Sequence, residues 1–330
     1  MRPTRHRLMT WTAGLCALSL LIGCAEEQPV PEAEAPRAIS PRERPVQAEV
    51  VALPSATSQA LAQYYVRLQN DLRGRGLLRT DDGHDAPFTD TVLARNFIRV
   101  ALFDEYTDLG HRFAARASES HLRRWEQPIR MCPQPIRMQT VFGATVPLEQ
   151  RQTDRAEVTA YAARLAEISG LSITPNASDP NYLVIFAGED DRSSFAPMLR
   201  QFIPGISDSA MLALMNPDRS TLCLVVAFGE TGQSNTYTRA IALIRGEHPQ
   251  LIRSACINEE LAQGLGLAND DMMVRPSIFN DSEEFALLTT HDALLLKMLY
   301  DPRLRPGMTI DEATPIVNQI ATELMTVPPA

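Results

Sequence analysis

The sequence is poor in cysteine and lysine, and it has no apolar run long enough to cross a membrane. Five cysteines in 330 residues are too few for a fold built on disulfides. Lys297 is the only lysine, and 31 basic residues stand against 40 acidic ones, which gives a formal charge of −9. This acidic balance argues against a nucleic-acid-binding protein. Because 45% of the residues are hydrophobic, the chain can form a packed core, and a disordered chain is excluded.

The first residues carry the pattern of a secretion signal. Arg2, Arg5 and Arg7 precede a mostly apolar, uncharged segment over residues 8–22. A membrane-spanning helix needs roughly twenty apolar residues, and this segment is shorter. A basic start followed by a short apolar run is typical of a signal peptide. We therefore expect residues 1–23 to be a signal peptide.

The end of this segment, Leu21-Ile22-Gly23-Cys24, resembles the bacterial lipoprotein signal. The resemblance implies cleavage before Cys24 and a lipid on that cysteine, which would anchor the protein to a membrane of the cell envelope without spanning it. Ala25, in place of aspartate, implies the periplasmic face of the outer membrane. Residues 24–54 are rich in proline and glutamate and have no apolar periodicity, so we expect a flexible tether.

The remaining chain divides into two predicted regions. A small helical N-terminal region is expected over residues 55–124, with helices at 55–78 and 91–106. A main domain is expected over residues 125–330, where strands and helices alternate. Its predicted strands are 135–142, 182–187, 222–228 and 238–245, and its predicted helices are 153–169, 251–266, 289–300 and 314–325. This order predicts an α/β (α+β) fold with a mixed sheet and helices packed on it.

The segment most informative about function is the predicted helix 251–266 and the residues after it. On a helix, Glu259, Glu260 and Gln263 share one face. The opposite face carries an apolar stripe formed by Ile257, Leu261 and Leu265. Gly266 would end the helix and turn the chain toward Asn269 and Asp270.

This spacing resembles the long zinc signature of the metzincin metallopeptidases, in which three histidines bind zinc and a glutamate acts as general base. Glu259, Gln263 and Asn269 stand at the positions of the three histidines, while Glu260 and Gly266 match the glutamate and the glycine. The resemblance implies a metzincin-like mixed twisted sheet. It also implies that the zinc ligands are missing.

The resemblance continues downstream. Phe279, within Pro276-Ser277-Ile278-Phe279-Asn280, stands where the family has its Met-turn methionine. Leu288-Thr289 and Leu299-Tyr300 are similar to the closing helix of that family. The run Glu-Glu-Leu-Ala-Gln with Leu-Gly and Asn-Asp also resembles small bacterial lipoproteins of a family described only as a domain of unknown function.

The missing ligands decide the expected chemistry. Zinc peptidases need three good ligands, which lower the pKa of the bound water from 15.7 to about 7. The neutral amides of Gln263 and Asn269 are poor substitutes. Calcium accepts carboxylates such as Glu259 and Asp270, but it usually needs six or more oxygen atoms from a flexible loop, and half of the candidate donors lie on a helix. We therefore expect no metal and no other cofactor.

The sequence thus favours a non-catalytic module that binds a peptide or an envelope protein. Clefts of the metzincin type hold an extended peptide against an edge strand, and this pairing needs no metal. The expected binding cleft contains Glu259, Glu260, Gln263, Asn269 and Asp270. One alternative is an atypical peptidase or hydrolase in which Glu260 is the general acid or base. Another is a purely structural lipoprotein whose cleft is filled by side chains.

Three cysteines remain after removal of the signal and lipidation of Cys24. They are Cys132, Cys223 and Cys256. Cys223 begins a predicted strand and Cys256 lies early in a predicted helix, so this pair is the favoured disulfide in an oxidising compartment. A thiol enzyme that uses Cys256 with His291 as base is the alternative.

Overall fold

The computed structural model describes residues 51–108, 113–126, 135–231 and 234–326. The predicted signal peptide, Cys24, Cys132 and nearly all of the predicted tether lie outside these residues. Residues 49–330 form one compact unit, and the predicted helical region and main domain both lie in it. No helix in the described part of the chain is long and apolar enough to cross a membrane.

The described helices and strands follow in chain order. The helices are α1 (Ala56–Gly74), α2 (Asp90–Ala101), α3 (Leu148–Ser169), the 3-10 helix η1 (Arg192–Phe195), α4 (Ala196–Phe202), α5 (Asp208–Met215), α6 (Gln250–Gln263), α7 (Thr290–Leu299) and α8 (Ile310–Thr326). The strands are β1 (Phe103–Asp108), β2 (Phe113–Glu119), β3 (Arg124–Trp125), β4 (Ile136–Phe142), β5 (Ile173–Thr174), β6 (Tyr182–Ala187), β7 (Cys223–Gly229) and β8 (Thr236–Arg245).

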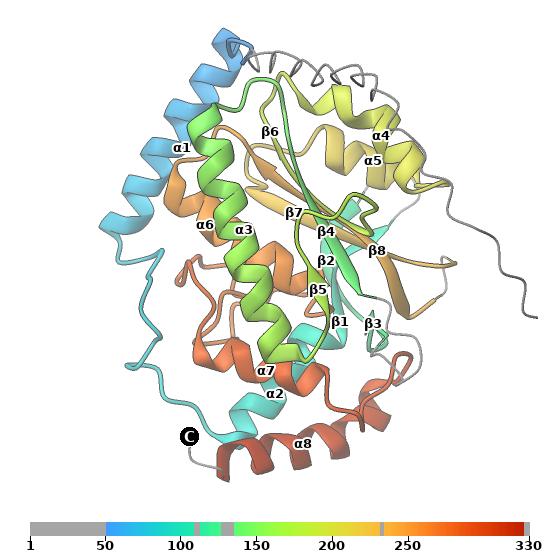
Figure 1. Cartoon of the computed structure of the whole chain (residues 1–330). Coiled ribbons are helices and arrows are strands. Elements are labelled where there is room, and N and C mark those ends of the chain that lie inside the picture. Colours follow the sequence, from blue (N-terminus) through green and yellow to red (C-terminus); the bar gives the residue numbers. More distant parts are fainter. Residues whose placement is uncertain (1–50, 109–112, 127–134, 232–233, 327–330) are drawn as a thin grey trace, which may run out of the picture. The chain divides into compact units, whose positions relative to one another are not determined.

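The main sheet is mixed, and its strands are mostly parallel (Figure 1). Strands β5, β4, β6 and β8 lie side by side and run parallel, and the short β3 also runs parallel to β8. Strand β7 pairs with β8 in the antiparallel direction. Strands β1 and β2 form a separate antiparallel pair. The fold is therefore the mixed α/β fold that the sequence predicts.

Helices cover both faces of the main sheet. In β6, Tyr182, Val184 and Phe186 point into a core shared with α3 and α6. The residues between them point into a second core, which is shared with η1, α4 and α5. All six residues of β6 are buried. A continuous apolar run is the expected pattern for a parallel strand that is covered on both faces.

The structure corrects several predicted boundaries. The predicted helix 91–106 ends at Ala101, because the following residues pair as β1 with β2. Helix α3 begins at Leu148 rather than residue 153, and α8 begins at Ile310 rather than residue 314, with Pro315 inside it. Helices α4 and α5 were not predicted from the sequence. The capping box at Thr289, in which the Asp292 side chain accepts from the Thr289 backbone, is confirmed.

Candidate functional site

Helix α6 carries the residues that the sequence singles out, and it is buried on nearly every side. Its apolar stripe, Ile257, Leu261 and Leu265, is fully buried against the sheet and the neighbouring helices. Because this stripe faces the core, Glu259, Glu260 and Gln263 are directed to another face, where they line a pocket.

Aromatic side chains hold the second half of α6 through its backbone. The hydroxyl of Tyr161 donates to the carbonyl of Asn258 at 2.7 Å, and that of Tyr182 donates to the carbonyl of Glu260 at 2.9 Å. Trp125 donates to the carbonyl of Gly264 at 2.9 Å. These bonds satisfy buried carbonyl groups, some of which the helix end leaves without a partner. They also fix the part of the helix that presents Glu260.

Helix α6 ends at Gln263, three residues before the predicted end at Gly266, and the chain turns sharply at Gly266, as the sequence predicts. Gly266 has φ +128°, and a Cβ atom there would lie 2.2 Å from the carbonyl oxygen of Arg123. Only glycine fits such a close approach at positive φ. After the turn, the Asn269 side chain donates to the carbonyl of Arg99 at 2.8 Å, and its backbone N–H donates to the carbonyl of Val100 at 3.1 Å. Asn269 therefore anchors the turn to the end of α2.

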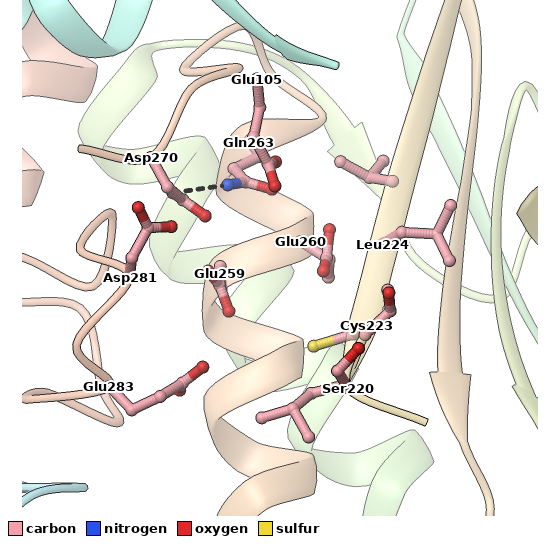
Figure 2. Close-up of a pocket in the computed structure, with 13 residues that line it drawn as sticks. Glu105, Ser220, Cys223, Leu224, Glu259, Glu260, Gln263, Asp270, Asp281 and Glu283 are labelled. Carbon is pink, nitrogen blue, oxygen red and sulfur yellow. Dashed lines mark hydrogen bonds between the residues drawn. The ribbon is translucent and has the colours of Figure 1, made fainter. Parts of the chain in front are cut away.

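The pocket lies between α6, the strand β7 and the loop that follows the turn (Figure 2). Its volume is about 210 Å³. Six carboxylic acids line it: Glu105, Glu259, Glu260, Asp270, Asp281 and Glu283. The other lining residues are Gln263 and the segment 220–225, which leads into β7. Among these described lining residues there is no lysine, arginine or histidine.

Burial and mutual repulsion shift the acidity of these groups. Burial raises the pKa of Glu259, Glu260 and Asp270 well above the usual values, and the negative charges of neighbouring carboxylates raise it further. Burial also raises the pKa of Asp281, and it raises that of Glu283 to about 7. The pocket therefore favours protons or other positive charge.

The hydrogen bonds inside the pocket leave one acceptor unused. The Gln263 amide donates to Asp270 Oδ1 at 2.8 Å, and the Glu259 and Asp270 side chains are also hydrogen-bonded. Glu260 is 3% exposed, and its Oε2 atom has no hydrogen-bond partner. A buried acceptor without a partner is costly, so this atom is a candidate contact for a ligand.

A disulfide closes one side of the pocket. It joins Cys223 on β7 to Cys256 on α6, the pair that the sequence favours, with Sγ atoms 2.02 Å apart. The Cys223 Sγ and carboxylate oxygens of Glu259 and Glu260 lie within 4.8 Å of one another. Because both sulfur atoms are bonded to each other, neither cysteine offers a thiolate to a metal or a substrate.

Two of the residues that the sequence resemblance compares with zinc-binding histidines, Gln263 and Asn269, are not available to zinc. The Gln263 nitrogen donates to Asp270, and Asn269 is committed to the backbone of α2 and is absent from the pocket lining. His291 is fully buried, and its Nε2 atom lies 3.1 Å from the Asn96 side-chain nitrogen. Neither histidine nor thiolate therefore supplies a ligand among the described residues of the pocket.

The structure thus brings four of the five predicted cleft residues together, Glu259, Glu260, Gln263 and Asp270. Asn269 is placed beside α2 instead. Sequence reasoning missed three acidic lining residues, namely Glu105, Asp281 and Glu283. Glu105 belongs to β1, which was predicted as helix, and the other two belong to an irregular loop without a periodic pattern.

Comparison with known proteins gives a family but no activity. Residues 90–319 match the model of a family described as a protein of unknown function, DUF2927. This range includes α2 to α6, the pocket and α7. No curated protein and no solved structure matches the chain.

Proposed function

We propose a function from the pocket, since the chain belongs to this family of unknown function. In this proposal the protein is a non-catalytic module of the cell envelope that holds an extended peptide of a partner along β7. One observation carries the proposal. Strand β7 lines the pocket and pairs only with β8 among the described strands, so no described strand pairs with its other edge. The unpaired backbone groups of an edge strand are suited to main-chain pairing with a peptide.

We further propose that the domain is a metzincin-type fold that has lost its zinc ligands. In support, α6 follows β8 directly in the chain and carries Glu259 and Glu260. Strand β7, which is antiparallel to β8, lies beside α6. The commitments of Gln263 and Asn269 to other hydrogen bonds support binding without zinc hydrolysis.

The proposed location is the periplasmic face of the outer membrane, with a lipid on Cys24 as the anchor. The test is metabolic labelling with palmitate. We expect the label in the wild-type chain and its loss in Cys24→Ala. Label that persists in the variant would contradict the anchor without affecting the pocket.

Peptide binding is tested with a displayed library of extended peptides and amide hydrogen exchange. A bound peptide should protect the backbone amides of β7, residues 223–229. The double variant Glu260→Ala with Gln263→Ala should bind the selected peptide at least about tenfold more weakly, a loss of about 1.4 kcal/mol. The exposed Glu167→Gln is the control. Unchanged binding by the double variant, or protection confined to other strands, would disprove the proposal.

A hydrolase that uses Glu260 as general acid is the second candidate. The raised pKa of this buried carboxyl, which lies beside other carboxylates, favours it. Such an enzyme would lose turnover in Glu260→Gln and keep substrate binding. A panel of peptide and ester substrates, followed by mass spectrometry, separates the two candidates. Turnover by the wild-type chain that Glu260→Gln abolishes would establish the hydrolase.

A further inference from the structure

We propose that the acidic pocket binds a hard divalent cation of the calcium class between the carboxylates of Glu259 and Glu260. The inference goes beyond peptide binding and does not depend on it. It also revises the sequence-based expectation of no metal, which rested on poor zinc ligands and, for calcium, on candidate donors of which half lie on a helix rather than in a flexible loop.

The first argument is the charge of the pocket. Six carboxylic acids line it, and none of the described lining residues is basic. Buried charges in proteins are normally paired with an opposite charge or bound to a metal, because an uncompensated buried charge is strongly destabilising. The lining supplies no positive charge of its own, so bound protons or a bound cation must balance these carboxylates.

The second argument is the position of the unused acceptor. Glu260 is 3% exposed, lines the pocket and leaves its Oε2 atom without a hydrogen-bond partner. Carboxylate oxygens of Glu259 and Glu260 lie within 4.8 Å of each other. Because calcium binds oxygen at about 2.3–2.6 Å, one ion can contact both carboxylates without separating them.

The third argument concerns the number and type of donors. Three further acidic residues line the pocket: Glu105 from β1, and Asp281 and Glu283 from the loop before α7. The fold therefore supplies oxygen donors besides those on α6, and the sequence alone did not predict them. A pocket of about 210 Å³ also has room for water molecules, which occupy about 30 Å³ each. Water commonly completes the coordination of calcium.

The same donors discriminate between metals. All the available pocket donors are oxygen atoms, since the Cys223 sulfur is held in the disulfide. Oxygen donors select hard cations, whereas zinc and copper favour nitrogen and sulfur ligands. Magnesium demands a compact octahedron, which a wide pocket lined from several segments does not provide. Calcium is therefore the expected ion.

The test is calorimetric titration of the full-length chain, stripped with chelator and kept free of reductant. We expect one calcium ion per chain, bound at least about tenfold more tightly than magnesium, and a rise in the unfolding temperature when calcium is added. Glu260→Gln and Glu259→Gln should each weaken calcium binding at least about thirtyfold. Glu167→Gln, which lies exposed on α3, should bind as the wild type does.

Two results would overturn the inference. One is a wild-type chain that takes up no calcium. The other is calcium binding that both glutamine variants retain, which would place the ion elsewhere. The alternative is that the pocket binds a basic side chain of a partner, and a parallel titration with lysine amide tests it. Saturable binding of lysine amide, without binding of calcium, would establish this alternative. None of these titrations contains a partner peptide, so their failure is distinct from a failure of peptide binding along β7.

Discussion

Glu260 buries one carboxylate oxygen, Oε2, without a hydrogen-bond partner. In metal-free protein, Glu260→Gln removes this charge and keeps the shape of the side chain. The new amide can donate to the neighbouring carboxylates. We expect the free energy of unfolding at pH 8 in the presence of chelator to rise by about 1–2 kcal/mol, since a buried acceptor without a partner costs about 1–3 kcal/mol.

Urea denaturation measures this change. Glu167→Gln serves as the control and should differ from the wild type by less than about 0.5 kcal/mol, as exposed substitutions usually do. A Glu260→Gln chain that is less stable than the wild type would mean that the carboxylate is paired in the folded protein.

At the level of single residues, the sequence predicted which pocket residues lie on the helix but not which residues from other segments join them. A helical period places Glu259, Glu260 and Gln263 on one face, and they do line the pocket together. For Asn269 the sequence had no means of locating the partner, because the carbonyl of Arg99 is 170 residues away along the chain. The role of such a residue depends on how distant segments pack.

The turn after α6 connects the helical residues of the pocket to Asp270. Gly266→Ala forces a Cβ to 2.2 Å from the carbonyl oxygen of Arg123 and strains a backbone with φ +128°. We expect it to cost about 4 kcal/mol of unfolding free energy, as the largest single substitutions do. The measurement is the urea midpoint.

Gly170 at the end of α3 is the matched control. It also has positive φ, +72°, but a Cβ there meets no atom within 4 Å. Gly170→Ala should therefore cost only the backbone strain, about 1 kcal/mol. Equal losses for the two substitutions would show that contact with Arg123 does not constrain the turn.

Elements that form through local interactions were predicted more accurately than elements that depend on pairing with another segment. Strand β6 was predicted with its observed bounds, since six consecutive apolar residues are a local signal. Strand β1 was read as the end of a helix, because Phe103–Asp108 is extended through pairing with β2 rather than through its own pattern. Pairing of this kind overrides local propensity.

The disulfide links β7 to α6 at one side of the pocket, and its effect is on the whole molecule. It closes a loop with a sequence separation of 33 residues. By loop-closure entropy we expect the double variant Cys223→Ala with Cys256→Ala to lose about 3–4 kcal/mol of unfolding free energy. A reductant should lower the unfolding temperature of the wild type and leave that of the variant unchanged. A wild type that is insensitive to reductant would show that the bond does not contribute to stability.

The acidic pocket should also make the stability of the metal-free protein fall as the pH rises. For Glu283 the folded pKa of about 7 exceeds the ordinary glutamate value of 4.5, so between these pH values the folded chain holds a proton that the unfolded chain has released. Stability from this proton is complete below about pH 4.5 and is lost as the pH rises through about 7. Burial also raises the pKa values of Glu259, Glu260 and Asp270, and these groups extend the loss of stability to higher pH.

Urea midpoints at pH 5, 6, 7 and 8 in the presence of chelator measure how stability changes with pH. Glu283→Gln should flatten it between pH 5 and 7, and a slope that the substitution leaves unchanged would mean that Glu283 titrates at its ordinary pKa.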